Sequence, residues 1–285
     1  MRFHNECCDV FVPDGREPVE ALSRTTHLCV GAHQDDVEMM AYHGIAECFG
    51  RGDKWFTGVV VTNGAGSPRT GIYSQYTDEE MLALRLREQR KAAYVGEYAC
   101  QIQLGYPFTT VRDPSRNEVC NDLLAILQIA KPEVVYLHNL ADKHDTHVAV
   151  AVRAISALRM LSPEFRPRKV YGCEGWRDLD WMPDQAKQTL PVSAYSNIAA
   201  SLVGVFDSQV TGGKRYDLAL QGRRLAHATY YDPFNVDAEL ALTYAMDLTP
   251  LVEDPNLPIV RHVLGFIDQL RTDVEQRLSE VSISN

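Results

Sequence analysis

The stretch that decides the fold reads Leu28-Cys29-Val30-Gly31-Ala32-His33-Gln34-Asp35-Asp36-Val37-Glu38-Met39-Met40. Its first half is an apolar run typical of a buried strand, and its second half begins a helical pattern. One imidazole and two adjacent carboxylates lie in the turn between the two halves. Because burying such groups costs free energy unless something needs them there, the stretch predicts a functional site at the end of a strand.

A second polar cluster follows another apolar strand. It reads Asp142-Lys143-His144-Asp145-Thr146-His147, and the strand before it is predicted at 134–138. We expect the two strand ends to meet and to share one divalent metal ion.

Strand and helix patterns alternate between residues 25 and 173. Strands are predicted at 25–32, 55–62, 100–104, 134–138 and 169–173, with helices at 36–49, 77–95, 117–130 and 146–161. This alternation predicts an α/β fold with a doubly wound, mostly parallel, Rossmann-like sheet of core order 3-2-1-4-5. In that order the first and fourth strands are neighbours at the switch point, where ligands bind beyond the strand ends.

The rest of the chain is less regular. Residues 1–24 show no clear periodicity and are expected to wrap the surface. Residues 174–285 form a C-terminal elaboration, with short strands expected at 191–195 and 202–206 and helices near 216–228 and 258–278. No linker rich in Gly, Ser or Pro divides the chain, so one domain spanning 1–285 is predicted.

Composition restricts the partners and the location. The net charge of −10 argues against a nucleic-acid backbone or an anionic membrane as the main partner and favours a small molecule. No run approaches the roughly 18 apolar residues of a membrane span. The seven cysteines form no CxxC pair, and the N-terminus carries no secretory pattern, so a cytoplasmic location is predicted. The sequence does not decide between a monomer and a homo-oligomer.

The two clusters together supply the ligands of a catalytic metal. His33, Asp36 and His147 form a set of two histidines and one carboxylate, and three such ligands with an open position are typical of catalytic zinc. Zinc lowers the pKa of a bound water toward about 7. Asp35 is then free to act as the general base, and His144 could stabilise an oxyanion. This combination suits the hydrolysis of an amide.

Each cluster also has a simpler interpretation. Two adjacent aspartates at a helix start often serve as a cap, and a lone HxxH is as often a solvated helix start. Only their joint placement at two strand ends favours a shared metal. A non-haem Fe(II) oxygenase stays open, with Fe²⁺ or another divalent ion bound. A sugar- or nucleotide-binding protein without catalysis is a further alternative, although the first turn lacks GxGxxG.

These motifs resemble those of the zinc-dependent de-N-acetylases related to PIG-L and LmbE. Ala32–Asp36 resembles the family's (P/A)HPDDE, Thr62–Gly64 its TNG turn, Arg85–Glu88 its RxxE helix and His144–His147 its HPDH motif, and 214–227 echoes its K…A…AH pattern. The resemblance covers about residues 25–230. It implies zinc bound by His33, Asp36 and His147, with Asp35 as the base and His144 as the oxyanion stabiliser or proton donor.

Three departures accompany the resemblance. Gln34 replaces the usual proline, and Glu38 lies one place later than the family's glutamate. Asp145-Thr146 replaces Pro-Asp, so the carboxylate that normally supports His144 is missing at its place. Asp142 and Asp145 are the candidates to replace it. A catalytically impaired member of the same fold therefore also stays open.

The sequence predicts a zinc amidase that removes an N-acetyl or similar N-acyl group from an amino sugar or its conjugate. Arg69 in the glycine-rich loop, Arg85 and Trp176 are the candidate substrate contacts. Arg85 could instead form a structural ion pair with Glu88, and Trp176 could anchor the C-terminal elaboration rather than stack on a sugar.

Overall fold

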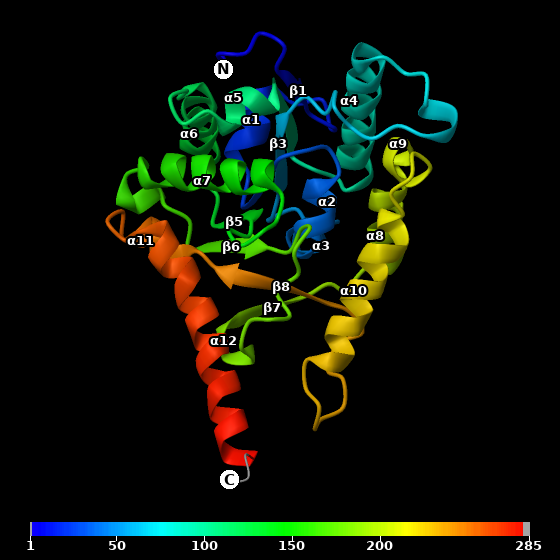
Figure 1. Ribbon diagram of the computed structural model, residues 1–285. Coiled ribbons are helices and arrows are strands. Elements are labelled where there is room, and N and C mark those ends of the chain that lie inside the picture. Colours follow the sequence, from blue (N-terminus) through cyan, green and yellow to red (C-terminus); the bar gives the residue numbers. More distant parts are fainter. Residues whose placement is uncertain (1, 282–285) are drawn as a thin grey trace.

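A single eight-stranded sheet lies between two layers of helices in the computed structural model, which describes residues 2–281 (Figure 1). The strands are β1 (Asp9–Phe11), β2 (His27–Gly31), β3 (Phe56–Thr62), β4 (Cys100–Tyr106), β5 (Val134–His138), β6 (Lys169–Cys173), β7 (Lys187–Pro191) and β8 (Leu242–Asp247). Their order in the sheet is β1-β4-β3-β2-β5-β6-β8-β7. The middle strands β4-β3-β2-β5-β6 pair in parallel, in the predicted order 3-2-1-4-5.

Helices cover both faces of this sheet. They are α1 (Pro18–Ser23), α2 (Asp36–Met40), α3 (Tyr42–Cys48), α4 (Asp78–Val95), α5 (Phe108–Arg112), α6 (Glu118–Ala130), α7 (Asp145–Arg159), α8 (Ser196–Gly204), α9 (Asp207–Val210), α10 (Tyr216–Tyr230), α11 (Thr249–Glu253) and α12 (Ile259–Val281). Apolar side chains of α1, α5, α6, α7 and α11 share one core cluster, and those of α2, α3, α4 and α8 share the other. Both faces of the parallel strands are therefore buried, which is why β2 and β3 carry no exposed residue.

Within residues 2–281, none of the helices combines the length and the apolar character that crossing a bilayer would require.

The helix predicted at 36–49 is divided. Ala41 leaves the helical conformation (φ −111°, ψ 21°), which separates α2 from α3. The carbonyls of Glu38 and Met39 accept hydrogen bonds from Arg224 of α10, at 3.3 and 3.0 Å. A side chain from a distant part of the sequence thus satisfies backbone groups that the break releases, and local periodicity carries no sign of it.

The C-terminal elaboration differs most from the prediction. Residues 202–206 were expected as a strand, but 202–204 lie in α8, where Leu202 and Val203 are buried. A short apolar run fits a buried helix segment as well as a strand, which explains the error. Of the strand predicted at 191–195, only Pro191 is in β7. Strand β8 was not predicted, and residues 1–24 contain β1 and α1 as well as surface loop.

Candidate active site

The two polar clusters meet at the carboxyl ends of β2 and β5, which are neighbours in the sheet. His33 and Asp36 come from the turn after β2, and His147 comes from the first turn of α7, after β5. The His33 and His147 rings lie 3.3 Å apart at their nearest nitrogens. The two clusters therefore lie side by side, as the sequence predicted.

Three potential ligand atoms form a nearly equilateral triangle. Nδ1 of His33 lies 3.2 Å from Oδ2 of Asp36 and 3.3 Å from Nε2 of His147, which lies 3.4 Å from the same oxygen. Zinc holds such atoms tetrahedrally at about 2.0–2.1 Å, which places neighbouring ligand atoms about 3.3–3.4 Å apart. The spacing and the donor types therefore fit one divalent ion.

The charge of Asp36 suits the same role. Burial alone would raise the pKa of this carboxyl, but the nearby His147 and His138 side chains outweigh it and hold that pKa well below its usual range. Oδ2 also accepts the backbone N–H of His33 at 2.7 Å. Asp36 is thus ionised and fixed in place, as a metal ligand must be.

His138, whose role the sequence left open, lies next to this triangle. Its ring is buried against that of His147, and its Nε2 is 3.5 Å from Asp36. Nε2 accepts the backbone N–H of Ala32 at 2.9 Å. Because that bond uses the lone pair of Nε2, this nitrogen supports the site from behind and is not a ligand.

Asp142 organises the second cluster. Its Oδ2 lies 3.1 Å from Nδ1 of His147, so His147 donates there and presents the lone pair of Nε2 to the triangle. A Cβ on Gly175 would lie 2.5 Å from the same oxygen, so this close packing requires glycine. Asp145 takes no part: its side chain is 71% exposed and pairs with Arg112 at 2.8 Å. Of the two carboxylates considered from the sequence, Asp142 lies in the site and Asp145 does not.

Asp35 occupies a strained position beside the triangle. Its φ of +88° is rare for a residue with a side chain and is typical of functional sites. Its Oδ2 lies 3.3 Å from two nitrogens of Arg85, which comes from α4. Burial raises the pKa of Asp35 to about 7, with Arg85 opposing and the Asp36 carboxylate adding to the rise. A carboxyl that exchanges protons near neutral pH suits a general base.

Arg85 is therefore a partner of Asp35 and not of Glu88. Its guanidinium also donates to the carbonyl of Gln34 and is buried. Glu88 instead accepts hydrogen bonds from the backbone and hydroxyl of Ser208, at 2.8 and 2.6 Å. The ion pair weighed from the sequence is absent between these two residues, and Arg85 holds the turn that contains Asp35.

His144 stacks on His147, with ring centres 4.4 Å apart, at the mouth of the site. Burial, followed by the neighbouring His147 and His33 rings, lowers the pKa of His144. Its Nδ1 is buried and makes no hydrogen bond to the described part of the chain. Neither Asp145 nor Asp142 bonds this ring, so His144 is a neutral imidazole that can offer an N–H to an oxygen gaining charge.

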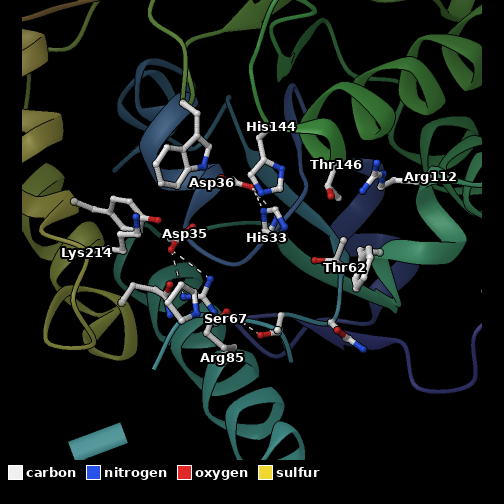
Figure 2. Close-up of a pocket in the computed structure, with 18 residues that line it drawn as sticks. His33, Asp35, Asp36, Thr62, Ser67, Arg85, Arg112, His144, Thr146 and Lys214 are labelled. Atoms are coloured by element: carbon white, nitrogen blue, oxygen red, sulfur yellow. Dashed lines mark hydrogen bonds and ion pairs between the residues drawn. The ribbon is translucent and has the colours of Figure 1, made fainter. Parts of the chain in front are cut away.

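A cavity of about 480 Å³ opens over these groups. Figure 2 shows His33, Asp35, Asp36 and His144 pointing into it, with Lys214 and Arg112 on opposite sides. Trp176 forms part of the wall, where its ring lies under the Lys214 ammonium at 4.8 Å. Arg112, Lys214 and Tyr216 were not among the predicted site residues. Lys214 begins the K…A…AH pattern noted in the sequence, whereas no local motif marks Arg112 or Tyr216.

The loop after β3 closes one side of the cavity. Gly64 has φ +70°, and a Cβ there would lie 2.2 Å from Oε1 of Gln34, so the TNG turn packs against the first motif only with glycine. Arg69 does not line the cavity. It donates to the carbonyls of Tyr76 and Ala65 and pairs with Asp78, so it braces the loop.

The family described as PIG-L, GlcNAc-PI de-N-acetylase, matches residues 28–158, which include both motifs. No curated protein matches the chain.

Solved structures share the fold at low sequence identity. The conserved protein TT1542 of Thermus thermophilus is 18% identical, with a TM-score of 0.62 over 82% of this chain and 99% of that one. GalB, the 4-carboxy-2-hydroxymuconate hydratase of Pseudomonas putida KT2440, is 16% identical, with a TM-score of 0.60 over 79% and 96%. The N,N'-diacetylchitobiose deacetylase of Pyrococcus horikoshii is 16% identical, with a TM-score of 0.58 over 77% and 83%. At these identities the likeness establishes the fold alone.

Proposed function

We propose that this protein removes an N-acyl group from an amino sugar or its conjugate in a metal-dependent reaction, because its residues 28–158 match the family described as PIG-L, GlcNAc-PI de-N-acetylase. The family match supports an enzyme that hydrolyses an amide. The observation that carries the proposal is the triangle of His33, Asp36 and His147, whose sides of 3.2 to 3.4 Å suit a divalent ion. Zinc is the ion that we propose.

The residues around the triangle have separate roles in the proposed hydrolysis. A divalent ion held there would polarise the acyl oxygen and make a water more acidic. Asp35, with a pKa of about 7, accepts the proton of the attacking water and later passes it to the leaving amine. Arg85 keeps this carboxylate oriented. His144, at the mouth of the same cavity, donates an N–H to the oxygen that gains negative charge.

The cavity has features that suit a sugar. Trp176 presents an aromatic face on which a sugar ring can stack, and Asn63, Ser67 and Thr62 add polar groups to the lining of the same cavity. Arg85 lines the cavity and orients Asp35, whereas Arg69 acts only through the loop that it braces. We therefore place Trp176 in direct contact with substrate and Arg69 behind it.

The first measurement is the metal content of purified protein. Wild type is expected to hold about one divalent ion per chain, and Asp36→Ala and His147→Ala are expected to lose it. Asp145→Ala is the matched control, because this exposed carboxylate lies outside the triangle. Wild type that stays metal-free after incubation with zinc, iron or manganese would overturn the proposal.

The second measurement is the release of free amine from a set of N-acetylated amino sugars. Wild type is expected to release amine and acetate in equal amounts, while Asp35→Asn keeps its metal and loses at least about 10²-fold in rate. A metal-loaded wild type that releases no amine from any of them would favour a binding protein or another water-adding reaction on this fold.

A further inference from the structure

The C-terminal helix α12 carries an apolar seam on its exposed side. Val260, Leu264, Ile267 and Val274 are 68%, 49%, 44% and 46% exposed. Their positions follow alternating steps of four and three residues, with Arg271 filling the step between Ile267 and Val274. Residues 278 and 281, also apolar and exposed, continue the same register. The pattern is the a/d repeat of a coiled coil, sustained over about three heptads.

A different face of α12 attaches the helix to the body. Val263 is buried, Phe266 packs against the core, and Nε2 of His262 lies 2.7 Å from the carbonyl of Asp247. Beyond residue 273 every described residue of the helix is exposed. Figure 1 shows this half projecting past β7 toward the C-terminus. The seam is therefore not needed for folding the body, and its second half extends into solvent.

The charges along the seam select a partner. In an antiparallel pair with a second copy, each a residue faces a d residue: Leu264 meets Val274, and Ile267 meets Arg271. The flanking Arg261 then lies opposite Glu275 of the second copy, twice by symmetry. The two Asp268 side chains lie between these pairs, and each is paired with Arg271 of its own helix. A parallel pair would instead place two Arg271 side chains against each other. The seam thus pairs opposite charges between the two copies in the antiparallel direction only.

We propose that α12 pairs antiparallel with α12 of a second copy of this chain, which makes the protein a homodimer. The two-fold axis passes near residue 269, midway between Leu264 and Val274. Each projecting half then lies along the attached half of the other helix. This arrangement covers the exposed seam on both copies and keeps Arg271 at the boundary with Asp268, its neighbour at 3.3 Å.

The experiment measures the mass of the full chain in solution by sedimentation velocity and light scattering. Wild type is expected to be a dimer at micromolar concentration, and Leu264→Asp is expected to weaken dimerisation on the order of 100-fold, because it places a charge in the seam. Gln269→Asp is the matched control, since it adds the same charge at the central level at an exposed position that faces away from the seam. A monomeric wild type, or a Leu264→Asp variant as dimeric as wild type, would overturn the proposal.

A charge exchange tests the direction of pairing. Arg261→Glu and Glu275→Arg are each expected to weaken the dimer about tenfold, and the double variant is expected to restore it. If the double variant dimerises no more tightly than the single variants, the antiparallel pair is ruled out. Metal content serves as the independent readout of folding, so loss of the dimer with the metal retained is distinct from failure of the proposed function.

Discussion

Asp142 accepts hydrogen bonds from Nδ1 of His147 and from the backbone N–H groups of His144, Trp176 and Arg177. These bonds join the turn after β5 to the turn after β6. Because Nδ1 of His147 donates to Asp142, the proton is fixed on that nitrogen and Nε2 keeps its lone pair for the proposed metal ion. One carboxylate thus sets both the shape of the proposed metal site and the position of Trp176.

We expect Asp142→Asn to weaken metal binding about 10- to 100-fold while the protein stays folded, because an amide is a weaker acceptor for the His147 Nδ1–H. Competition with a chelator of known affinity measures the change. Asp145→Asn is the control, since its exposed carboxylate pairs with Arg112 and lies outside the triangle. Equal affinities for the two variants would contradict the role assigned to Asp142.

At this scale the sequence predicted which candidate ligands meet better than it predicted the residues that support them. His33, Asp36 and His147 lie in motifs at two neighbouring strand ends, and the fold brings them within 3.4 Å of one another. Asp142 and Asp145 are both close to His147 in the sequence. In the folded chain Asp142 points toward His147 and Asp145 points toward solvent. Arg112 and Tyr216 reach the cavity from distant segments, so no local pattern could reveal them.

At the scale of elements, β2 is the strand on which the site depends, and its first residue is an ionisable group in the core. His27 is 7% exposed, and its Nδ1 lies 2.9 Å from the hydroxyl of Thr26. Burial, with smaller effects of Lys54 and His43, lowers the pKa of His27 to about 4. The unfolded chain takes up a proton near pH 6.5, but the folded chain does not.

The stability contributed by His27 is therefore complete above pH 6.5 and is lost as the pH falls toward 4. Between about pH 7.5 and 5 this linkage amounts to about 2 kcal/mol in the free energy of unfolding. His27→Gln removes the group that titrates, so its stability should fall less over the same range in denaturant unfolding. Parallel pH curves for wild type and variant would show that His27 is not held neutral.

The elements themselves divide into predictable and unpredictable ones. The parallel core was predictable because buried strands alternate with amphipathic helices and because such units wind in one direction. The break at Ala41 was not, since it depends on Arg224 from α10. Strands β7 and β8 were not located either, because antiparallel pairs at the end of a sheet arise from contacts between distant segments.

At the scale of the whole molecule, the sheet ends on both sides in antiparallel pairs. β8 and β7 extend it beyond β6, and β1 covers the outer side of β4. The segment around β1 is fixed by several long-range contacts. Asn5 donates to the carbonyl of Leu104 at 2.8 Å, His4 pairs with Asp122 at 2.6 Å, and Asp9 pairs with Arg90.

Through these contacts the segment around β1 protects the outer edge of β4. Without β1, the backbone of β4 would present an unpaired edge next to the apolar Ile102 and Leu104, and such an edge invites other chains to add to it. A chain that starts at residue 25 is expected to aggregate, as measured by turbidity against time, whereas an extension placed before residue 1 should not. Resistance to strand-by-strand aggregation is thus encoded outside residues 28–158, and it can be lost while every catalytic side chain is kept.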